Sequence, residues 1–258
     1  MKKTTLVTGA SSGIGLELAR ECAANGHDLV IVARREERLE DFAKTVRKEF
    51  DVNVNIVVMD LSVDGSRKNL FDQVKSQNIE IDYLINNAGF GDYGPFVDSN
   101  LDRQIEMVNL NVMALTELTR LFLPDMVGRR QGAILNVAST AAFQAGPMMS
   151  VYFATKAFVL HFSEAVANEV HQTGVRVVAL CPGTTESEFA DIAQAERSLM
   201  FNMRKLPTSK QVARYGYVSM IKGKRVAVHG LLNKILIFSV RLVPRKVVTA
   251  IARRMTAD

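Results

Sequence analysis

Tryptophan is missing from this chain, and its 258 residues hold only two Cys, four His and six Pro. The two cysteines, Cys22 and Cys181, lie far apart, which excludes a disulfide scaffold and fits no zinc-ligand spacing. The histidines do not cluster in the sequence, so no metal is expected. Proteins of a reducing compartment commonly contain few cysteines and no disulfides, so we expect a cytoplasmic protein. The apolar stretch after the N-terminus stops at Gly9, too early for the core of a signal peptide.

Repeats, low-complexity tracts and Pro- or Gly-rich linkers are also missing. Hydrophobic residues make up 48% of the chain and charged residues 23%, as in ordinary globular proteins. We therefore expect one domain over residues 1–230 that both binds a cofactor and carries the reaction. Its polar segment 184–208 is interpreted as a mobile helical flap over the substrate. Residues 231–258 are expected to form a helical extension of the same domain.

The net charge of +5 could indicate a nucleic-acid-binding protein, but its distribution argues against that function. Residues 231–258 carry six Lys and Arg against one Asp, which accounts for the whole excess. Within them, Leu231–Val243 is too short and too charged to span a bilayer, and Arg245–Met255 is typical of a basic amphipathic helix. Three roles stay open for this extension. A cover for the substrate cleft or a subunit interface is favoured, and peripheral contact with an anionic membrane is the alternative.

Short β-branched runs alternate with stretches whose apolar residues recur at helical spacing. Most of the runs are almost continuously apolar, which is typical of parallel strands buried on both faces. The expected strands are Thr4–Thr8, Asp28–Ala33, Asn53–Met59, Tyr83–Asn86, Gly132–Val137, Val175–Leu180 and Arg225–Val228. The alternation predicts an α/β fold with a doubly wound, Rossmann-type parallel sheet of about seven strands and helices on both faces.

A glycine-rich stretch, Thr8–Gly15, follows the first expected strand and opens the first helix. Gly9, Gly13 and Gly15 let the backbone turn sharply and approach a pyrophosphate, and a helix N-terminus offers free N–H groups. The spacing G-x-x-x-G-x-G differs from the commonest dinucleotide fingerprint. The strand before it and the helix after it nevertheless favour nucleotide binding.

The second expected strand ends at Ala33-Arg34-Arg35, near where a dinucleotide fold usually carries a carboxylate for the adenosine ribose. No acid stands at this tip, and Glu36 and Glu37 suit the first turn of a helix. Two guanidinium groups favour a 2′-phosphate, so NADP(H) is the expected cofactor and NAD(H) the alternative. A solvated surface helix is the plainer interpretation of the same run.

Three further groups of residues indicate a catalytic site. Tyr152 and Lys156 stand four apart on one face of an expected helix. Ser139 ends the fifth expected strand and Asn86–Gly89 follows the fourth, at the sheet edge where doubly wound folds bind ligands. Ser139 can also be a helix cap and Tyr152 a packed aromatic, but their joint occurrence favours a site.

These motifs together resemble a short-chain dehydrogenase/reductase of the single-domain branch. The motifs that match are Thr8–Gly15, Asp60-Leu61, Asn86–Gly89, Ser139, Tyr152-x-x-x-Lys156 and Pro182-Gly183. The resemblance implies that Tyr152 is the general acid/base, that Lys156 favours its phenolate and binds the nicotinamide ribose, and that Ser139 holds the substrate oxygen. It also implies an Asn that holds a water in a proton relay. Asn111 fits the family's spacing to Leu123-Pro124, and Asn109 is the fallback.

The resemblance further implies which residues contact the cofactor. They are Gly9, Ser11, Ser12, Gly13, Ile14 and Gly15 at the pyrophosphate, Arg34 and Arg35 at the 2′-phosphate, Asp60 and Leu61 at the adenine, Asn87, Ala88 and Gly89 on the adenosine side, and Pro182, Gly183, Thr185, Tyr152 and Lys156 at the nicotinamide end. Two positions depart from the family: Ser12 stands where NADP-specific members often carry a basic residue, and Ser187 replaces the usual Thr.

The expected function is therefore NADPH-dependent reduction of a carbonyl, or oxidation of the matching secondary alcohol, in a homodimer or homotetramer. Four sets of residues are expected to line the substrate pocket, and they indicate an apolar or mixed substrate of an acyl-like kind: Phe90–Phe96, Phe143–Met149, Phe189 and Met200. Two alternatives stay open. One is an NADP(H)-binding sensor without turnover, and the other is an isomerase or dehydratase on the same scaffold.

Overall fold

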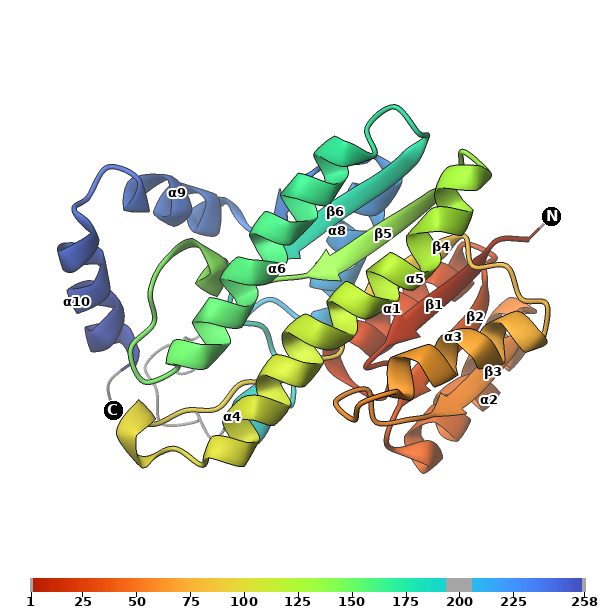
Figure 1. Ribbon diagram of the computed structural model, residues 1–258, viewed down its shortest axis with the longest axis horizontal. Coiled ribbons are helices and arrows are strands. Elements are labelled where there is room, and N and C mark those ends of the chain that lie inside the picture. Colours follow the sequence, from red (N-terminus) through yellow and green to blue (C-terminus); the bar gives the residue numbers. More distant parts are fainter. Residues whose placement is uncertain (1, 194–205, 257–258) are drawn as a thin grey trace.

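The computed structural model describes residues 2–193 and 206–256 (Figure 1). Seven parallel strands form one sheet in the order β3-β2-β1-β4-β5-β6-β7. The strands are β1 (Thr4–Thr8), β2 (Asp28–Ala33), β3 (Val54–Val58), β4 (Tyr83–Asn86), β5 (Gly132–Val137), β6 (Val175–Cys181) and β7 (Val226–Val228). Each begins and ends within one residue of its prediction. The predicted doubly wound sheet is confirmed, with the strand order reversing between β1 and β4.

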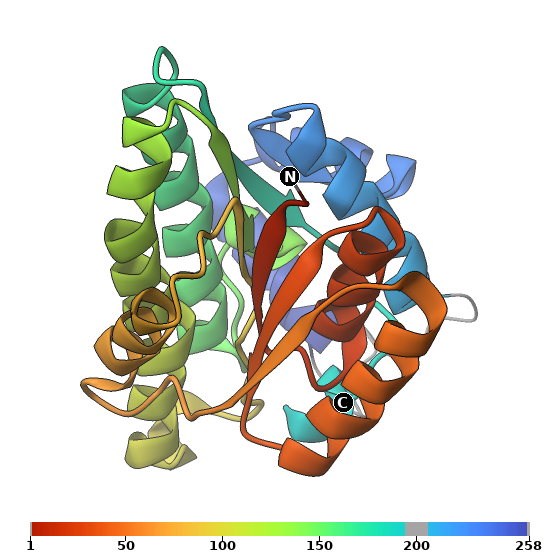
Figure 2. The ribbon, with the colours of Figure 1, turned by 90° about the vertical axis from the view of Figure 1, so that its right-hand side faces the viewer.

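Helices cover both faces of the sheet (Figures 1 and 2). On one face lie α1 (Gly13–Ala24), α2 (Glu36–Phe50) and α8 (Ser209–Ile221), and on the other lie α3 (Ser66–Ser76), α5 (Leu115–Gly128) and α6 (Ser150–Glu169). The other helical segments of the described chain are η1 (Phe96–Asp98), α4 (Leu101–Val108), η2 (Asn109–Ala114), η3 (Thr140–Phe143), α7 (Phe189–Ile192), α9 (Leu231–Val240) and α10 (Arg245–Thr256).

The pattern of α2 shows why these segments are helical. Leu39, Phe42 and Val46 recur at helical spacing and are almost fully buried against the sheet. Glu36 and Glu37 occupy the first turn, where their negative charges interact favourably with the positive end of the helix dipole. The helix therefore begins directly after Ala33-Arg34-Arg35, which leaves both arginines at the tip of β2 as predicted.

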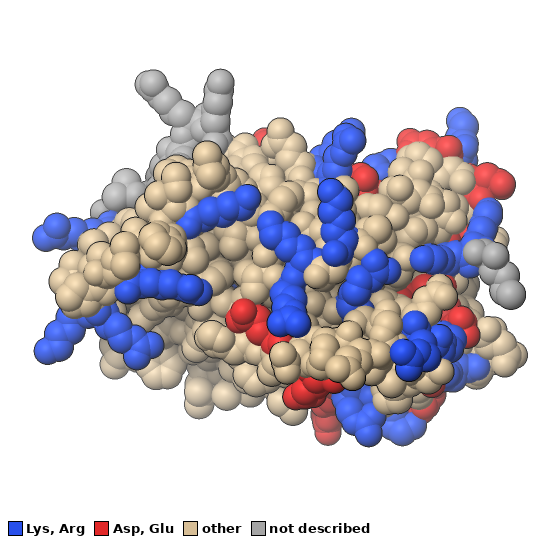
Figure 3. Space-filling view, turned by 90° about the horizontal axis from the view of Figure 1, so that it is seen from above, with Lys and Arg blue, Asp and Glu red and all other residues tan. Residues whose placement is uncertain are grey.

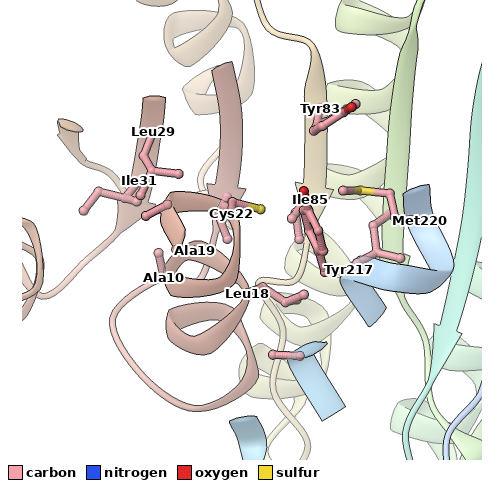
Figure 4. Close-up of a cluster of buried hydrophobic side chains, with 14 of the residues drawn as sticks. Ala10, Leu18, Ala19, Cys22, Leu29, Ile31, Tyr83, Ile85, Tyr217 and Met220 are labelled. Carbon is pink, nitrogen blue, oxygen red and sulfur yellow. The ribbon is translucent and has the colours of Figure 1, made fainter. Parts of the chain in front are cut away.

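Side chains from α1, β4 and α8 gather in one buried cluster (Figure 4). Leu18, Ile85 and Met220 are fully buried there, and each such side chain contributes about 1.5–3 kcal/mol by leaving water. Gly216 lets α8 lie close to the sheet, because a Cβ at that position would lie 2.7 Å from Leu180 Cδ2. This packing fixes α1, and with it the glycine-rich loop at its N-terminus.

One long helical region differs from the prediction. Apolar residues recur at helical spacing from Leu110 to Met126, which predicts a helix there; the structure is helical over this range but has the π-helical turn η2 between α4 and α5. Such turns are frequent at functional sites because the wider turn re-aims its side chains. Here the π-helical turn contains Asn109 and Asn111.

The C-terminal extension consists of α9 and α10, separated at Pro244. The predicted basic helix Arg245–Met255 corresponds to α10. Among the described residues, no helix is both long and apolar enough to cross a membrane. Of the predicted flap 184–208, residues 194–205 lie outside the described residues, and the remainder holds α7 and a bridge between Glu186 and Thr208.

Candidate active site

A cavity of 460 Å³ lies along the carboxyl ends of the parallel strands. Residues that follow β1, β2, β3, β4, β5 and β6 all contribute to its wall. The residues predicted from the sequence that line it are Gly9, Ser11, Ser12, Gly13, Ile14, Gly15, Arg34, Arg35, Asp60, Leu61, Asn87, Ala88, Gly89, Ser139, Tyr152, Lys156, Pro182, Gly183 and Thr185. The structure thus brings the predicted cofactor residues together in one place. Asn111 lies just behind the wall.

The glycine-rich loop is shaped by contacts between β1 and β4. Gly9 has a φ of +67°, and a Cβ on Gly15 would collide with the carbonyl oxygen of Gly9, so both positions require glycine. Asn87 Nδ2 donates to the carbonyl oxygen of Thr8 at 3.0 Å, and Thr8 Oγ1 accepts from the N–H of Asn87 at 3.0 Å. No described side chain caps α1 at Ser12, and its first turn holds no acid. Its N-terminus is therefore open to an anion.

Arg35 folds over this loop. Its guanidinium donates to Ser11 Oγ at 3.1 Å and to Ser12 Oγ at 2.7 Å, and it forms an ion pair with Glu188 at 2.9 Å. The Arg35 side chain is 41% exposed and paired with an acid, so the alternative interpretation, a solvated surface run, stays open. Partial burial raises the pKa of Glu188, but hydrogen bonds from Arg35 and Arg38 outweigh it and lower that pKa.

Arg34 lies nearer to solvent, with 61% of its side chain exposed, and pairs with Asp60 and Glu106 at 3.3 Å each. Partial burial raises the pKa of Asp60, but hydrogen bonds from Ser62 and the charge of Arg34 have the larger combined effect. The pKa of Asp60 is therefore lowered from its ordinary value. Asp60 is therefore held as a carboxylate at the rim of the cavity. Such an oxygen accepts a hydrogen bond from an amino group.

Tyr152 and Lys156 lie one turn apart on α6, and both are buried. The ammonium of Lys156 lies 5.8 Å from the centre of the Tyr152 ring and donates to the carbonyl oxygen of Val137 at 2.8 Å. Ser139 is the N-cap residue of η3, and its hydroxyl accepts from the N–H of Ala141 at 3.1 Å. The plainer expectation that Ser139 caps a helix is thus correct, and the same side chain also lines the cavity.

Burial dominates the electrostatics of this pair. It raises the pKa of Tyr152 to about 12, although the hydroxyl of Ser139 lowers it somewhat. Burial lowers the pKa of Lys156 to about 8, against a smaller opposing effect of Cys181. Strongly shifted values in a cleft are typical of functional sites. Near pH 7 the phenol keeps its proton and is placed to donate it.

Asn111 is 2% exposed and projects from the π-helical turn η2. Its Nδ2 donates to Thr155 Oγ1 at 3.1 Å, and Thr155 Oγ1 donates to the carbonyl oxygen of Tyr152 at 2.7 Å. A Cβ on Gly89 would lie 2.7 Å from Asn111 Oδ1 and 3.6 Å from Lys156 Nζ, so these two side chains approach each other over Gly89. Asn109 is only half-buried, and neither asparagine belongs to the cavity lining itself. The assignment of the proton relay to Asn111, with Asn109 as the fallback, stays a prediction.

Sequence reasoning missed two partners in this site. Thr155 links Asn111 to Tyr152, and its position three residues after Tyr152 could have indicated a shared helix face. Glu188 gave no signal, because it pairs with Arg35 across 153 positions of the chain.

Apolar side chains fill the end of the cavity beside Tyr152. Phe90, Met149 and Phe153 are buried in one cluster there, and the Phe189 ring lies 5.2 Å from the Tyr152 ring. Phe90 and Met149 belong to the predicted substrate loops, Phe189 was predicted here and lies in the segment after β6, and Phe153 lies on α6 and was not predicted. Met200, also predicted here, lies outside the described residues.

No cluster of His, Cys, Asp and Glu suited to a metal occurs in the described part of the chain. Cys22 and Cys181 are buried and unpaired, and burial raises the pKa of each thiol to about 12. Both thiols are therefore poor nucleophiles.

Comparison with known proteins links this geometry to one family. The sequence model described as "short chain dehydrogenase" matches residues 3–198. The very-long-chain 3-oxoacyl-CoA reductase of Anas platyrhynchos is 33% identical over 195 residues, which cover 73% of this chain and 62% of the duck protein. The match thus spans less than two thirds of that relative. The NADP-dependent 3-hydroxy acid dehydrogenase of Schizosaccharomyces pombe is 35% identical over 190 residues, 73% of each chain.

Two solved structures share the whole fold. A short-chain dehydrogenase from Sphingobium yanoikuyae in complex with NADPH is 31% identical, with a TM-score of 0.83 over 93% of this chain and 94% of the other. A bulky-bulky ketone specific alcohol dehydrogenase from Comamonas testosteroni is 28% identical, with a TM-score of 0.79 over 93% and 92%.

Proposed function

Because this chain belongs to the short-chain dehydrogenase/reductase family, a family of oxidoreductases, we propose that it reduces a carbonyl with NADPH or oxidises the matching secondary alcohol. The observation that carries the proposal is the convergence of Ser139, Tyr152 and Lys156 on one cavity that continues to an uncapped helix N-terminus. A cavity that joins an acid/base to a phosphate cradle suits hydride transfer with a dinucleotide.

The residues present fit NADP(H). Gly9 and Gly15 leave the backbone bare where a pyrophosphate would lie, and the uncapped N–H groups of α1 would face it. Arg35 holds the hydroxyls of Ser11 and Ser12 with donors that suit a 2′-phosphate. The NADPH-bound Sphingobium structure and the NADP-dependent yeast relative support this preference over NAD(H).

When bound, the nicotinamide supplies or accepts the hydride. The protein's own residues then handle the proton and the charge. Tyr152 donates its phenolic proton to the carbonyl oxygen, which the hydroxyl of Ser139 holds in place. Lys156 lies beside the ring and stabilises the phenolate left behind. Asn111, which approaches Lys156 over Gly89, is the residue to hold a water that returns the proton.

An apolar substrate fits the described end of the cavity. Phe90, Met149 and Phe189 surround Tyr152 with aromatic and thioether surface rather than with charge. Relatives named for 3-oxoacyl-CoA and 3-hydroxy acid substrates support a 3-oxoacyl or 3-hydroxyacyl compound. The predicted flap 184–208 is proposed to contribute through Phe189, which lies within its described part.

The deciding experiment follows NADPH fluorescence, first in a binding titration against NADH and then with a panel of 3-oxoacyl and bulky ketone substrates. The proposal expects tighter binding of NADPH and one NADP⁺ formed for each alcohol. Binding without turnover on any substrate would favour the sensor alternative. Turnover without net NADPH consumption would favour the isomerase or dehydratase.

Assembly into a homodimer or homotetramer and a cytoplasmic location remain proposals. Exposed apolar side chains before and along α4 support assembly, since Phe96, Val97 and Leu101 are 63%, 88% and 67% exposed. Light scattering of the purified protein tests assembly directly: a single monomeric species at micromolar concentration would contradict it.

A further inference from the structure

Helices α9 and α10 expose apolar side chains to solvent. The exposed residues of the two helices form the α9–α10 surface. Along α9, Leu231, Ile235 and Phe238 share one helix face and are 72%, 56% and 62% exposed. In α10, Val247 and Ile251 continue the pattern at 46% and 49% exposure. Several large apolar side chains exposed in one region mark an interaction site rather than ordinary surface.

All the charged residues that accompany these apolar side chains on α9 and α10 are basic. Between Leu231 and Thr256 the sequence holds no Asp or Glu. All six basic side chains in that range are exposed: Lys234, Arg241, Arg245, Lys246, Arg253 and Arg254. None of the six forms an ion pair with any acid in the described part of the chain. Figure 3 shows blue side chains around tan surface at the left end of the molecule, where α9 and α10 lie in Figure 1.

The two helices are held in place by their opposite faces. Thr256 Oγ1 donates to the carbonyl oxygen of Pro147 at 3.0 Å, and Tyr93 OH donates to the carbonyl oxygen of Thr256 at 2.6 Å. Ala252 is 3% exposed against the domain, and Asn233 Nδ2 donates to the carbonyl oxygen of His229 at 2.8 Å. The exposed faces are therefore presented on a folded support.

We propose that the α9–α10 surface docks this protein on an anionic phospholipid bilayer. Amphipathic helices that expose apolar side chains among Lys and Arg lie in the membrane interface, where the apolar groups enter the acyl boundary. Clustered basic side chains are attracted to the negative surface of anionic lipids. The α9–α10 surface combines exposed apolar side chains with cations and contains no acid. It therefore matches both the acyl region and the anionic headgroups of such a bilayer.

A second copy of the chain suits this surface less well. A symmetric contact places the same patch of one protomer against that of the other. On this surface it would bring two sets of six cations together with no acid between them. Like charges placed against each other across an interface oppose association. An anionic partner has no such penalty.

Docking would also bring the substrate end of the cavity close to lipid. Tyr93 and Pro147, which contact Thr256, belong to the two loops that carry Phe90 and Met149 into the cavity wall. An apolar substrate dissolved in the bilayer would therefore meet the site nearby. This consequence rests on the proposed function, whereas the docking itself does not.

The test is flotation of the intact protein with phosphatidylcholine vesicles, with or without phosphatidylglycerol, and without cofactor or substrate. The proposal expects recovery with the anionic vesicles, little with the neutral ones, and loss of most binding in about 1 M salt, where charges are screened within about 3 Å. Because the readout is binding, a failed proposal on the reaction would leave this result unaffected. Absence of the wild-type protein from the anionic vesicles would overturn the docking proposal.

Two double variants separate this surface from the rest of the molecule. Arg245→Glu/Lys246→Glu and Ile235→Ser/Phe238→Ser should each lower the partition coefficient about tenfold or more. The matched controls, Lys44→Glu/Lys48→Glu on α2 and Val58→Ser/Val63→Ser near β3, change exposed residues elsewhere and should bind like the wild type. Equal losses in variants and controls would overturn the proposal. So would a variant that alters oligomeric state in light scattering yet floats like the wild type.

Discussion

Asn111 and Phe90 exchange two hydrogen bonds: Asn111 Oδ1 accepts from the N–H of Phe90 at 3.1 Å, and Asn111 Nδ2 donates to its carbonyl oxygen at 2.9 Å. One side chain of the π-helical turn thus satisfies both backbone groups of a buried loop residue. The loop after β4, which forms part of the cavity wall, is tied to η2 at this point.

Replacing Asn111 with Ala should therefore cost both stability and activity. The buried N–H and carbonyl of Phe90 lose their partners, which should lower the free energy of unfolding by about 3 kcal/mol. Urea denaturation measures this, and kcat should fall while NADPH still binds. Asn109→Ala, in the same turn but half-buried, is the control. A larger loss of kcat in Asn109→Ala than in Asn111→Ala would assign the proton relay to Asn109 instead.

Tyr152→Phe should remove turnover and keep the cofactor site. The substitution deletes only the phenolic oxygen, and general acid catalysis is worth about 10²–10⁴-fold in rate, so kcat should fall by that factor. The dissociation constant for NADPH, measured by fluorescence, should hardly change. Tyr215→Phe also removes a hydroxyl, one that accepts from Lys224 and lies outside the cavity lining, and should leave kcat intact. Near-normal activity of Tyr152→Phe would refute its role.

Arg35→Ala should weaken NADPH selectively. A charge-assisted hydrogen bond contributes about 1.5–3 kcal/mol, so losing it should raise the NADPH dissociation constant about tenfold or more. NADH has no 2′-phosphate, and its affinity should stay the same. Arg38→Ala is the matched control, because Arg38 pairs with the same Glu188 but does not line the cavity. Equal weakening of both cofactors would mean that Arg35 supports the loop rather than recognises the phosphate.

Glu188→Gln should have the opposite effect on NADPH. The Glu188 carboxylate accepts a hydrogen bond from the guanidinium of Arg35. A 2′-phosphate that binds Arg35 would have to compete with this carboxylate. Removing one partly exposed negative charge should tighten NADPH binding about threefold and leave NADH unchanged, in line with the modest energy of surface ion pairs. Glu186→Gln, an exposed acid two residues earlier, is the control. Weaker NADPH binding in Glu188→Gln would show that the carboxylate positions Arg35.

The strands could be predicted closely because parallel strands buried on both faces are almost continuously apolar, as Leu29–Val32 and Ala133–Leu135 are. The cofactor residues could be predicted because each stands in a short motif at the end of a strand. The carboxyl ends of parallel strands meet at one sheet edge, so local motifs such as Thr8–Gly15 become one cavity.

What escaped prediction depends on contacts distant in the chain. Around the π-helical turn at Asn109–Ala114, the apolar residues keep the spacing of an ordinary helix. The turn could therefore not be predicted from the sequence. The ion pairs of Arg34 with Glu106 and of Arg35 with Glu188 join elements that only the folded sheet brings together. Those pairs decide how available each arginine is to a phosphate.

The buried ammonium of Lys156 makes stability depend on pH in a way that one substitution can isolate. Its pKa is lowered by burial to about 8 from the ordinary 10.5, so between these values the unfolded chain binds more protons than the folded one. Stability therefore rises with pH across that window, by a total on the order of 3 kcal/mol, and the destabilisation caused by burying the ammonium is fully present below pH 8.

Lys156→Met removes the ammonium and hence this dependence of stability on pH. The melting temperature of the variant minus that of the wild type should fall by about 5 °C between pH 7 and pH 9.5, measured without cofactor. Staying below pH 10 avoids the opposing effect of Tyr152, whose raised pKa lowers stability only at higher pH. The same substitution at the exposed Lys44 on α2 is the control. A flat difference for Lys156→Met would mean that the Lys156 ammonium is not penalised by burial, and that the phenol of Tyr152 has a fully charged neighbour well above pH 8.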